Sequence, residues 1–234
     1  ADVQIGTEAS QGVIDNTTAI RGNSLYRLVD GIYWTTADAN TKALGGYLAS
    51  ISSYKEDKFL WDTFARQIPI SAADINWGYF IGLRRNPGAS KDIWENWYWD
   101  NGETTASYRN SAFNPGDPTS EPNGDDSPYT HVWGYTPGIH ETPLWNDTPN
   151  FGNAGLNGTS LYGLAEIPLS LTTTLPTTIK EGTGEFTINI DLSAGTTSQK
   201  HSQVKGTRVW YTVSGIDTSD LETGYALQGS GDWH

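Results

Sequence analysis

Cysteine and methionine are both absent from this chain of 234 residues. Without cysteine there can be no disulfides, no thiolate zinc sites and no cysteine nucleophiles. The absence does not place the chain in the cytosol, because many bacterial surface proteins also avoid cysteine. Long apolar runs are missing too, so the sequence contains neither a membrane-spanning segment nor a signal-peptide core. The chain begins at Ala1, and we expect it to be a piece of a longer protein.

Basic residues are scarce: 14 Lys and Arg stand against 27 Asp and Glu, a formal net charge of −13. Nucleic acids and anionic membranes are bound through basic patches. We therefore expect neither nucleic-acid binding nor membrane insertion. Divalent cations suit such an acidic chain better.

Large apolar side chains are plentiful. Hydrophobic residues make up 36% of the chain and aromatic residues 12%, which is enough for a packed core. The 26 Gly and 11 Pro indicate many turns and short strands. We interpret six tryptophans as core residues: Trp34, Trp61, Trp94, Trp97, Trp99 and Trp145.

Two helices are predicted, both in the first third of the chain. A short one covers Ala37 to Leu44 and ends at Gly45-Gly46. The second begins at Ser53, which forms a capping box with Glu56 three residues later. Its apolar residues recur at helical spacing: Phe59, Leu60, Phe64 and Ile68. Short strands are expected elsewhere, at 24–29, 47–51, 77–85, 96–100, 129–135, 143–147 and 161–169.

The stretch "SEPNGDDSPY", residues 120–129, crowds acids into a segment that can be neither a helix nor a central strand. Calcium takes about six to eight oxygen ligands from carboxylates, amides, carbonyls and waters. Glu121, Asn123, Asp125 and Asp126 offer such oxygens, and Asn146-Asp147 offers more. Vicinal sugar hydroxyls could fill the open positions of an ion held between these segments. A solvated turn is the alternative, because Asp, Asn, Gly and Pro are ordinary turn residues.

Six segments in order resemble the C-type lectin-like domain: "ALGGYLASI", "YFIGL", "WYWDNGE", "EPN", "WND" and "YGLAEIP". They span about 145 residues, from roughly 24 to 168. The resemblance implies an α+β fold with two helices, small antiparallel sheets and a long calcium-binding loop region. It also implies binding of sugars with equatorial vicinal hydroxyls, such as mannose and fucose.

The resemblance implies ligands for both the ion and the sugar: Glu121, Asn123, Asn146 and Asp147. A further acid of the family pattern would fall at Ser127 or Pro128, so Asp126 is expected to substitute for it, with Asp125 in reserve. The loop 134–143 could border the sugar, and Tyr135 and His140 are candidate contacts.

Two departures from the family pattern stand out. Thr41 and Ala165 occupy the places where family members commonly carry paired cysteines, so packing must replace the disulfide. An earlier triplet, Asp117-Pro118-Thr119, is similar to the "EPN" motif and leaves a second alignment of the loop open.

Three regions are expected: 1–22 as an N-terminal strand or linker, 23–169 as the lectin-like domain, and 170–234 as an all-β sandwich segment. The last resembles part of a Calx-beta-like sandwich from a bacterial RTX-like adhesin. It has roughly four or five strands, whereas a sandwich needs about seven. Either the chain is cut within that domain, or residues 1–22 complete it.

Together these patterns predict calcium-dependent carbohydrate binding by a secreted bacterial surface adhesin. The expected cofactor is Ca²⁺, and the expected partners are fucose- or mannose-type glycans of host or neighbouring cells and adjacent adhesin domains. The alternative is a protein- or ice-binding module with structural calcium only. An enzyme is not expected, because Asp125 and Asp126, two acids so close together on a loop, lack the burial that an acid catalyst needs.

Overall fold

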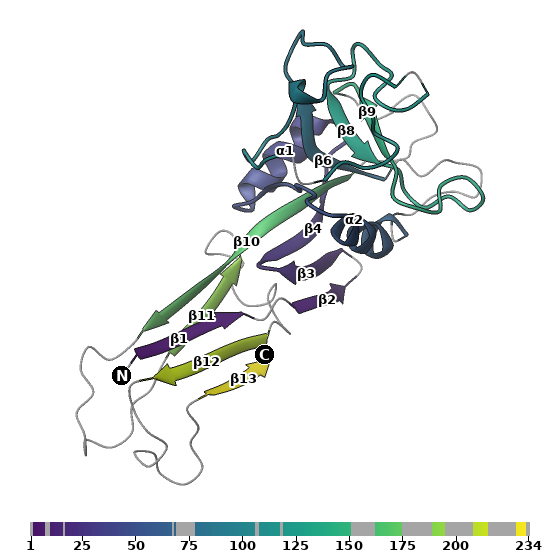
Figure 1. The fold of residues 1–234 in the computed structure, drawn as a ribbon. Coiled ribbons are helices and arrows are strands. Elements are labelled where there is room, and N and C mark those ends of the chain that lie inside the picture. The colour runs from purple at the N-terminus through teal and green to yellow at the C-terminus, as the bar shows by residue number, and fades with distance from the viewer. Residues whose placement is uncertain are drawn as a thin grey trace, which may run out of the picture.

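The computed structural model describes residues 2–7, 10–15, 17–66, 68, 78–105, 108–117, 119–150, 162–174, 189–194, 208–214 and 228–232. The molecule is elongated, and one long strand, β10 (Tyr162–Thr174), links its two ends (Figure 1). The helices and most of the sheet lie at one end. Strands near the two chain termini lie at the other.

Both predicted helices are confirmed. The first, α1 (Trp34–Ala43), begins three residues before the expected start. Its Trp34 indole N–H donates to the Ile81 carbonyl at 2.9 Å, which fastens the first turn to the sheet. The second, α2 (Tyr54–Leu60), starts at the Ser53 cap and continues as a π-helical turn, η1 (Trp61–Ala65). A 3-10 turn that was not predicted, η2 (Trp94–Asn96), precedes β7 (Trp97–Trp99).

The main sheet is mixed and runs in the order β2-β3-β4-β10-β6-β8-β9. Its further strands are β2 (Ser10–Asp15), β3 (Thr18–Gly22), β4 (Ser24–Asp30), β6 (Tyr79–Arg85), β8 (Tyr129–Val132) and β9 (Trp145–Thr148). Strand β10 pairs antiparallel with β4 and parallel with β6, while β7 and β5 (Tyr47–Leu48) join at the side. In the β8–β9 pair, His131 lies opposite Asn146 and Thr130 opposite Asp147.

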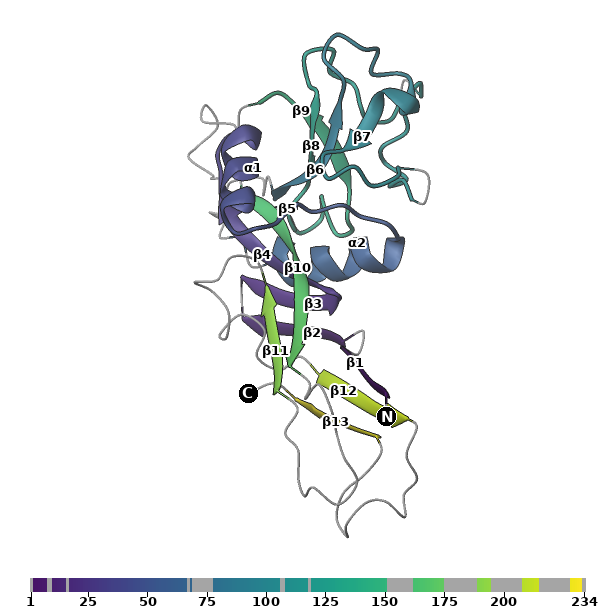
Figure 2. The same ribbon diagram turned by 90° about the vertical axis from the view of Figure 1, so that its left-hand side faces the viewer.

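The two helices cover opposite sides of this sheet (Figure 2). The side chains of β6 alternate between these two faces. Tyr79, Ile81 and Leu83 belong to the larger core cluster, which includes residues of α2. Phe80 points the other way and packs with Trp34 of α1. Helix α1 approaches β10 closely where Gly163 stands, since a Cβ there would lie 2.7 Å from that of Ala37.

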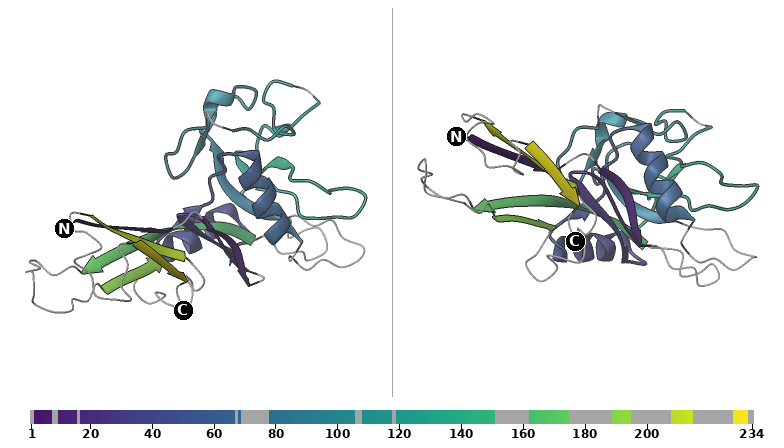
Figure 3. Two further views of the ribbon diagram at one scale, coloured as in Figure 1. Left: turned by 60° about the horizontal axis from the view of Figure 1, so that its bottom comes forward. Right: turned by 90° about the horizontal axis from the view of Figure 1, so that it is seen from below.

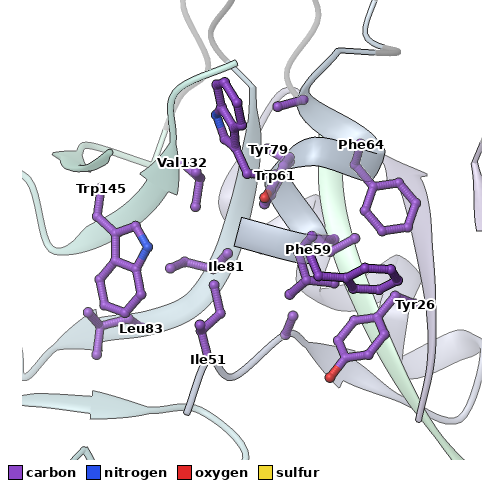
Figure 4. Close-up of a cluster of buried hydrophobic side chains, with 14 of the residues drawn as sticks. Tyr26, Ile51, Phe59, Trp61, Phe64, Tyr79, Ile81, Leu83, Val132 and Trp145 are labelled. Carbon is purple, nitrogen blue, oxygen red and sulfur yellow. The ribbon is translucent and has the colours of Figure 1, made fainter. Parts of the chain in front are cut away.

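An aromatic cluster fills the core on the α2 side, and Figure 4 shows Trp145 from β9 lying beside Val132 and Leu83. Trp145 makes edge-to-face contacts with three rings: those of Trp99, Tyr108 and Phe113. Five of the six tryptophans predicted for the core are at most 2% exposed, and Trp94 is half-buried. Thr41 and Ala165 are fully buried, so packing does occupy both positions where paired cysteines were absent.

At the far end, β10 continues through residue 169 without a break and pairs with β11 (Asn189–Ala194). A separate sheet has the order β1-β12-β13, formed by β1 (Asp2–Thr7), β12 (Arg208–Ser214) and β13 (Gln228–Asp232). Figure 3 shows the β10–β11 pair and the β1-β12-β13 sheet as separate layers. Residues from both chain ends therefore meet in one sheet. Among the residues described, no helix has the length and apolar character needed to cross a membrane.

Candidate functional site

The candidate site forms where the loop before β8 meets β9. Glu121 is held by neighbouring backbone, because its N–H donates to the Ala112 carbonyl and its carbonyl accepts from the Asn114 N–H. The Glu121–Pro122 peptide is cis. The β8–β9 pairing then sets Asn146 and Asp147 beside this loop.

Asp147 is the anchor of the loop and is only 5% exposed. Its Oδ1 accepts from the Asn123 N–H and its Oδ2 from the Gly124 N–H, both at 2.9 Å. Two successive backbone N–H groups on one carboxylate form an anion-binding nest. Gly124 is required here, because a Cβ would lie 2.5 Å from Ser127 Oγ and 2.9 Å from Asp147 Oδ2.

Glu121 brings a second carboxylate to the same place. Its Oε1 accepts from Asn123 Nδ2 at 3.1 Å, whereas its Oε2 is buried and has no protein partner. Burial, together with the neighbouring Asp147 carboxylate, raises the pKa of Glu121 to about 7. Two carboxylates share a poorly solvated space, and a bound cation would stabilise their ionised forms.

The residues present fit a calcium ion. The unpartnered Glu121 Oε2 could serve as a ligand oxygen, and Asp147 could offer its carboxylate and backbone carbonyl. Asn146 Nδ2 lies 2.8 Å from that carbonyl and 3.0 Å from His131 Nε2, which places the Asn146 amide at the same edge. No group of three or more His, Asp or Glu side chains converges within the described residues. A site here would therefore combine two carboxylates with amide and carbonyl oxygens.

Asp125 and Asp126, expected as additional ligands, are both exposed. The backbone carbonyl of Asp125 accepts a hydrogen bond from Arg85 Nη2. The side-chain Oδ1 of Asp125 lies 3.9 Å from Lys91 Nζ. Asp125 therefore has basic groups of the protein itself as neighbours. A ligand role for either acid stays a prediction.

The alternative triplet folds into a turn of its own. Asp117 Oδ1 accepts from the Thr119 N–H at 2.9 Å and from its hydroxyl at 2.7 Å. These hydrogen bonds lower the pKa of Asp117. Pro118 lies outside the described residues. The nest on Asp147 is made by Asn123 and Gly124, which favours the alignment that uses Glu121.

The two candidate sugar contacts lie in different surroundings. His140 stacks on Trp133 with ring centroids 4.7 Å apart, and Trp133 meets His131 edge-on at 4.7 Å. His140 is thus connected to Asn146 through two aromatic rings. Tyr135 packs instead against Trp61 and lies 4.4 Å from Arg66 Cζ, on the η1 side of the loop.

Three residues beside the site were not identified from the sequence: Arg85, Gly124 and His131. His131 is completely buried and contacts Asn146. Only its position on β8, opposite Asn146, could have indicated this contact.

In the main sheet, β4 pairs with β10, and the two helices cover the two faces of the sheet. A long loop region carries the acidic residues. The fold is C-type lectin-like. The two helices and mixed sheet match it, as the order of the sequence motifs predicted.

Solved structures of C-type lectin-like proteins are similar to part of this chain at low identity. The C-type lectin domain of murine dendritic cell inhibitory receptor 2, solved with an N-glycan, is 18% identical, covers 62% of this chain and 91% of its own, and has a TM-score of 0.41. The cow C-type carbohydrate-recognition domain of CD23, solved in the presence of GlcNAc2Man3 oligosaccharide, has corresponding values of 19%, 67%, 96% and 0.41. A calcium-independent type II antifreeze protein has values of 19%, 69%, 98% and 0.42.

No protein-family model matches the chain, and no curated protein matches it either.

Proposed function

We propose that the lectin-like domain binds carbohydrate through a calcium ion held between the 121–123 loop and β9. The observation that carries this proposal is the convergence of two carboxylates, Glu121 and Asp147, with one buried Glu121 oxygen that has no partner. An ion at this place would satisfy that oxygen and offset the repulsion between the acids.

Glu121 and Asn123 are arranged to recognise a pair of neighbouring hydroxyls. Their side chains already contact each other through Oε1 and Nδ2, at 3.1 Å. The carboxylate can accept a hydrogen bond from one sugar hydroxyl, and the amide can donate one to another. Bound calcium would supply the coordination that holds both hydroxyls. Mannose- and fucose-type sugars carry hydroxyl pairs of this kind.

Asn146 and Asp147 complete the proposed ligand set. Asp147 is immobilised by the two loop amides, and the Asn146 amide is oriented by His131. A single sugar ring buries little area, so we expect affinities of roughly millimolar to tens of micromolar. Useful attachment would then depend on several copies binding together.

The wider setting we propose is a secreted bacterial adhesin that attaches to glycans of host or neighbouring cells. The pairing of β1 with β12 supports a split sandwich into which the lectin-like domain is inserted. Strands β8 and β9 lie at the opposite end of the molecule from β1 and β13 (Figure 1). That arrangement suits a binding tip on a stalk, with neighbouring adhesin domains beyond the stalk and no catalytic role.

Calorimetric titration with Ca²⁺ and then with fucose and mannose tests the proposal. Wild type and Glu121→Gln would be compared with Asp117→Asn, which removes the same charge from the same loop but not from the site. We expect calcium-dependent sugar heat in wild type and Asp117→Asn, and none in Glu121→Gln. Calcium binding without sugar binding would favour a protein or ice ligand. Loss in neither variant would contradict the proposed site.

A further inference from the structure

Arg85 is a buried cation beneath the acidic loop, residues 120–129. It ends strand β6 and is 6% exposed. Its backbone N–H donates to the Pro128 carbonyl at 2.7 Å, and its guanidinium Nη2 donates to the Asp125 carbonyl. One residue thus holds two points of the loop that follows Asn123.

The Arg85 guanidinium also packs against an aromatic ring, that of Trp97. Its Cζ lies 5.6 Å from the centre of the Trp97 ring, within the range of a cation–π contact. Burying a charge is costly unless hydrogen bonds compensate. The Asp125 carbonyl supplies such a bond to Nη2, while Nε is buried without a partner, so the loop and the guanidinium stabilise each other through this contact.

A second basic residue lies at the same end of the loop. Lys91 Nζ is 2.7 Å from Asp92 Oδ1 and 3.9 Å from Asp125 Oδ1. The carbonyl of Lys91 accepts from the Trp97 indole N–H at 3.1 Å, which anchors this segment to β7. Unlike Arg85, Lys91 approaches the loop through the charge of its side chain.

The loop therefore has two unlike ends. Asp125 faces basic groups of the protein, whereas Glu121 has a buried oxygen without a partner next to Asp147. A cation attracted to this loop would meet repulsion at the first end and two neighbouring carboxylates, one with an unpartnered oxygen, at the second.

We propose that Arg85 is a positioning residue that holds the acidic loop in its binding conformation before an ion arrives, and that the loop consequently takes one calcium ion, at the Glu121–Asp147 end. This inference rests on the proposed function for the identity of the ion. The nest made by Asn123 and Gly124 on Asp147 then exists in advance, and calcium binding need not order it.

Two variants that each remove one positive charge separate positioning from simple electrostatics. Charge alone would make both Arg85→Gln and Lys91→Gln bind calcium more tightly, because a nearby repulsive charge is lost. Positioning predicts that Arg85→Gln weakens calcium binding by about tenfold or more, the loss of one charge-assisted hydrogen bond. Lys91→Gln should bind equally well or more tightly, and Arg85→Lys should recover part of the loss.

Calorimetry of wild type, the two Gln variants and Arg85→Lys gives the affinities and the stoichiometry. We expect one ion per chain in wild type. Calcium binding in Arg85→Gln that is as tight as in wild type would overturn the positioning role, and two ions in wild type would overturn the one-ion inference.

Hydrogen exchange on wild type in chelator decides the matter if Arg85→Gln does not fold. We expect the amides of Asn123 and Gly124 to exchange at least about tenfold more slowly than in an unstructured peptide, because both are hydrogen-bonded to Asp147. Free exchange until calcium is added would overturn the inference. Protected amides with no calcium binding in wild type would instead overturn the proposed function and leave the preformed loop standing.

Discussion

Replacing Asp57 with Asn would test the buried polar network that supports β9. Asp57 lies in α2 and is fully buried. Its Oδ2 accepts from the Tyr108 hydroxyl at 2.9 Å and from Asn110 Nδ2 at 2.8 Å. Its Oδ1 accepts from the Trp145 indole N–H at 3.2 Å, so the network contacts the strand that carries the site.

The magnitude follows from the burial of the carboxyl group. Burial raises the pKa of Asp57 from 3.8 to about 6, although hydrogen bonds from Asn110, Trp145 and Tyr108 oppose the rise. A raised pKa means that the folded protein favours the protonated carboxyl more than the unfolded chain does. The stability due to this group is fully present below pH 3.8 and is lost as the pH rises through about 6, by about 3 kcal/mol in total.

Urea unfolding of wild type and Asp57→Asn at pH 4 and pH 8, in chelator, measures this effect. Asn cannot ionise, so its stability lacks this pH-dependent contribution. At pH 4 the variant should be less stable by about 1–3 kcal/mol, because an amide N–H replaces an acceptor facing the Trp145 N–H. At pH 8 the difference should shift in favour of the variant by most of the 3 kcal/mol given by linkage.

The comparison cancels other titrating groups, among them Glu166, for which burial raises the pKa to about 7. Glu166 lies among Ser24, Tyr26 and Ser50 and is unchanged in both proteins. The same difference in unfolding free energy at both pH values would refute the reasoning, because it would mean that Asp57 titrates alike in the folded and unfolded chains.

Three further predictions concern the site and the stalk. Gly124→Ala should weaken calcium binding by about tenfold or more with little change in thermal unfolding, since its Cβ would press on Ser127 and Asp147; unchanged calorimetric affinity would contradict this. His131→Phe should weaken sugar binding by roughly threefold or more, because Asn146 loses a hydrogen-bond partner; equal sugar affinity would contradict that role. Deleting residues 1–7 should expose the edge of β12 and cause self-association in light scattering; a well-behaved monomer would contradict the split arrangement.

Local sequence signals predicted local structure well. The Ser53–Glu56 capping box marks the start of α2, because capping depends on residues three positions apart. Helix α1 was placed too late, since its first turn is stabilised by a contact with Ile81, 47 residues away. The 3-10 turn at Trp94–Asn96 was not predicted, because three residues are too few to show a helical period.

At the candidate site, too, the sequence indicates which residues are present, and long-range contacts decide how they are arranged. Glu121, Asn123, Asn146 and Asp147 could be named as candidate ligands in advance because their residue types and order suit an ion with oxygen ligands. Their sequence could not show that the Asp147 carboxylate is held by two backbone amides of the opposite loop. Nor could it show that the rings of Trp133 and His131 connect His140 to this edge.

What the sequence determined by itself is the chemistry on offer: an acidic chain without cysteine, two helices, many short strands, and two oxygen-rich motifs, with Trp145 lying 22 residues after Asn123. Only the tertiary structure decided which charges oppose one another. Arg85 lies 40 positions from Asp125 and reaches it because β6 runs beside β8. Electrostatic and hydrogen-bond energies depend on distance in space and on burial, and the long-range pairing of strands sets both.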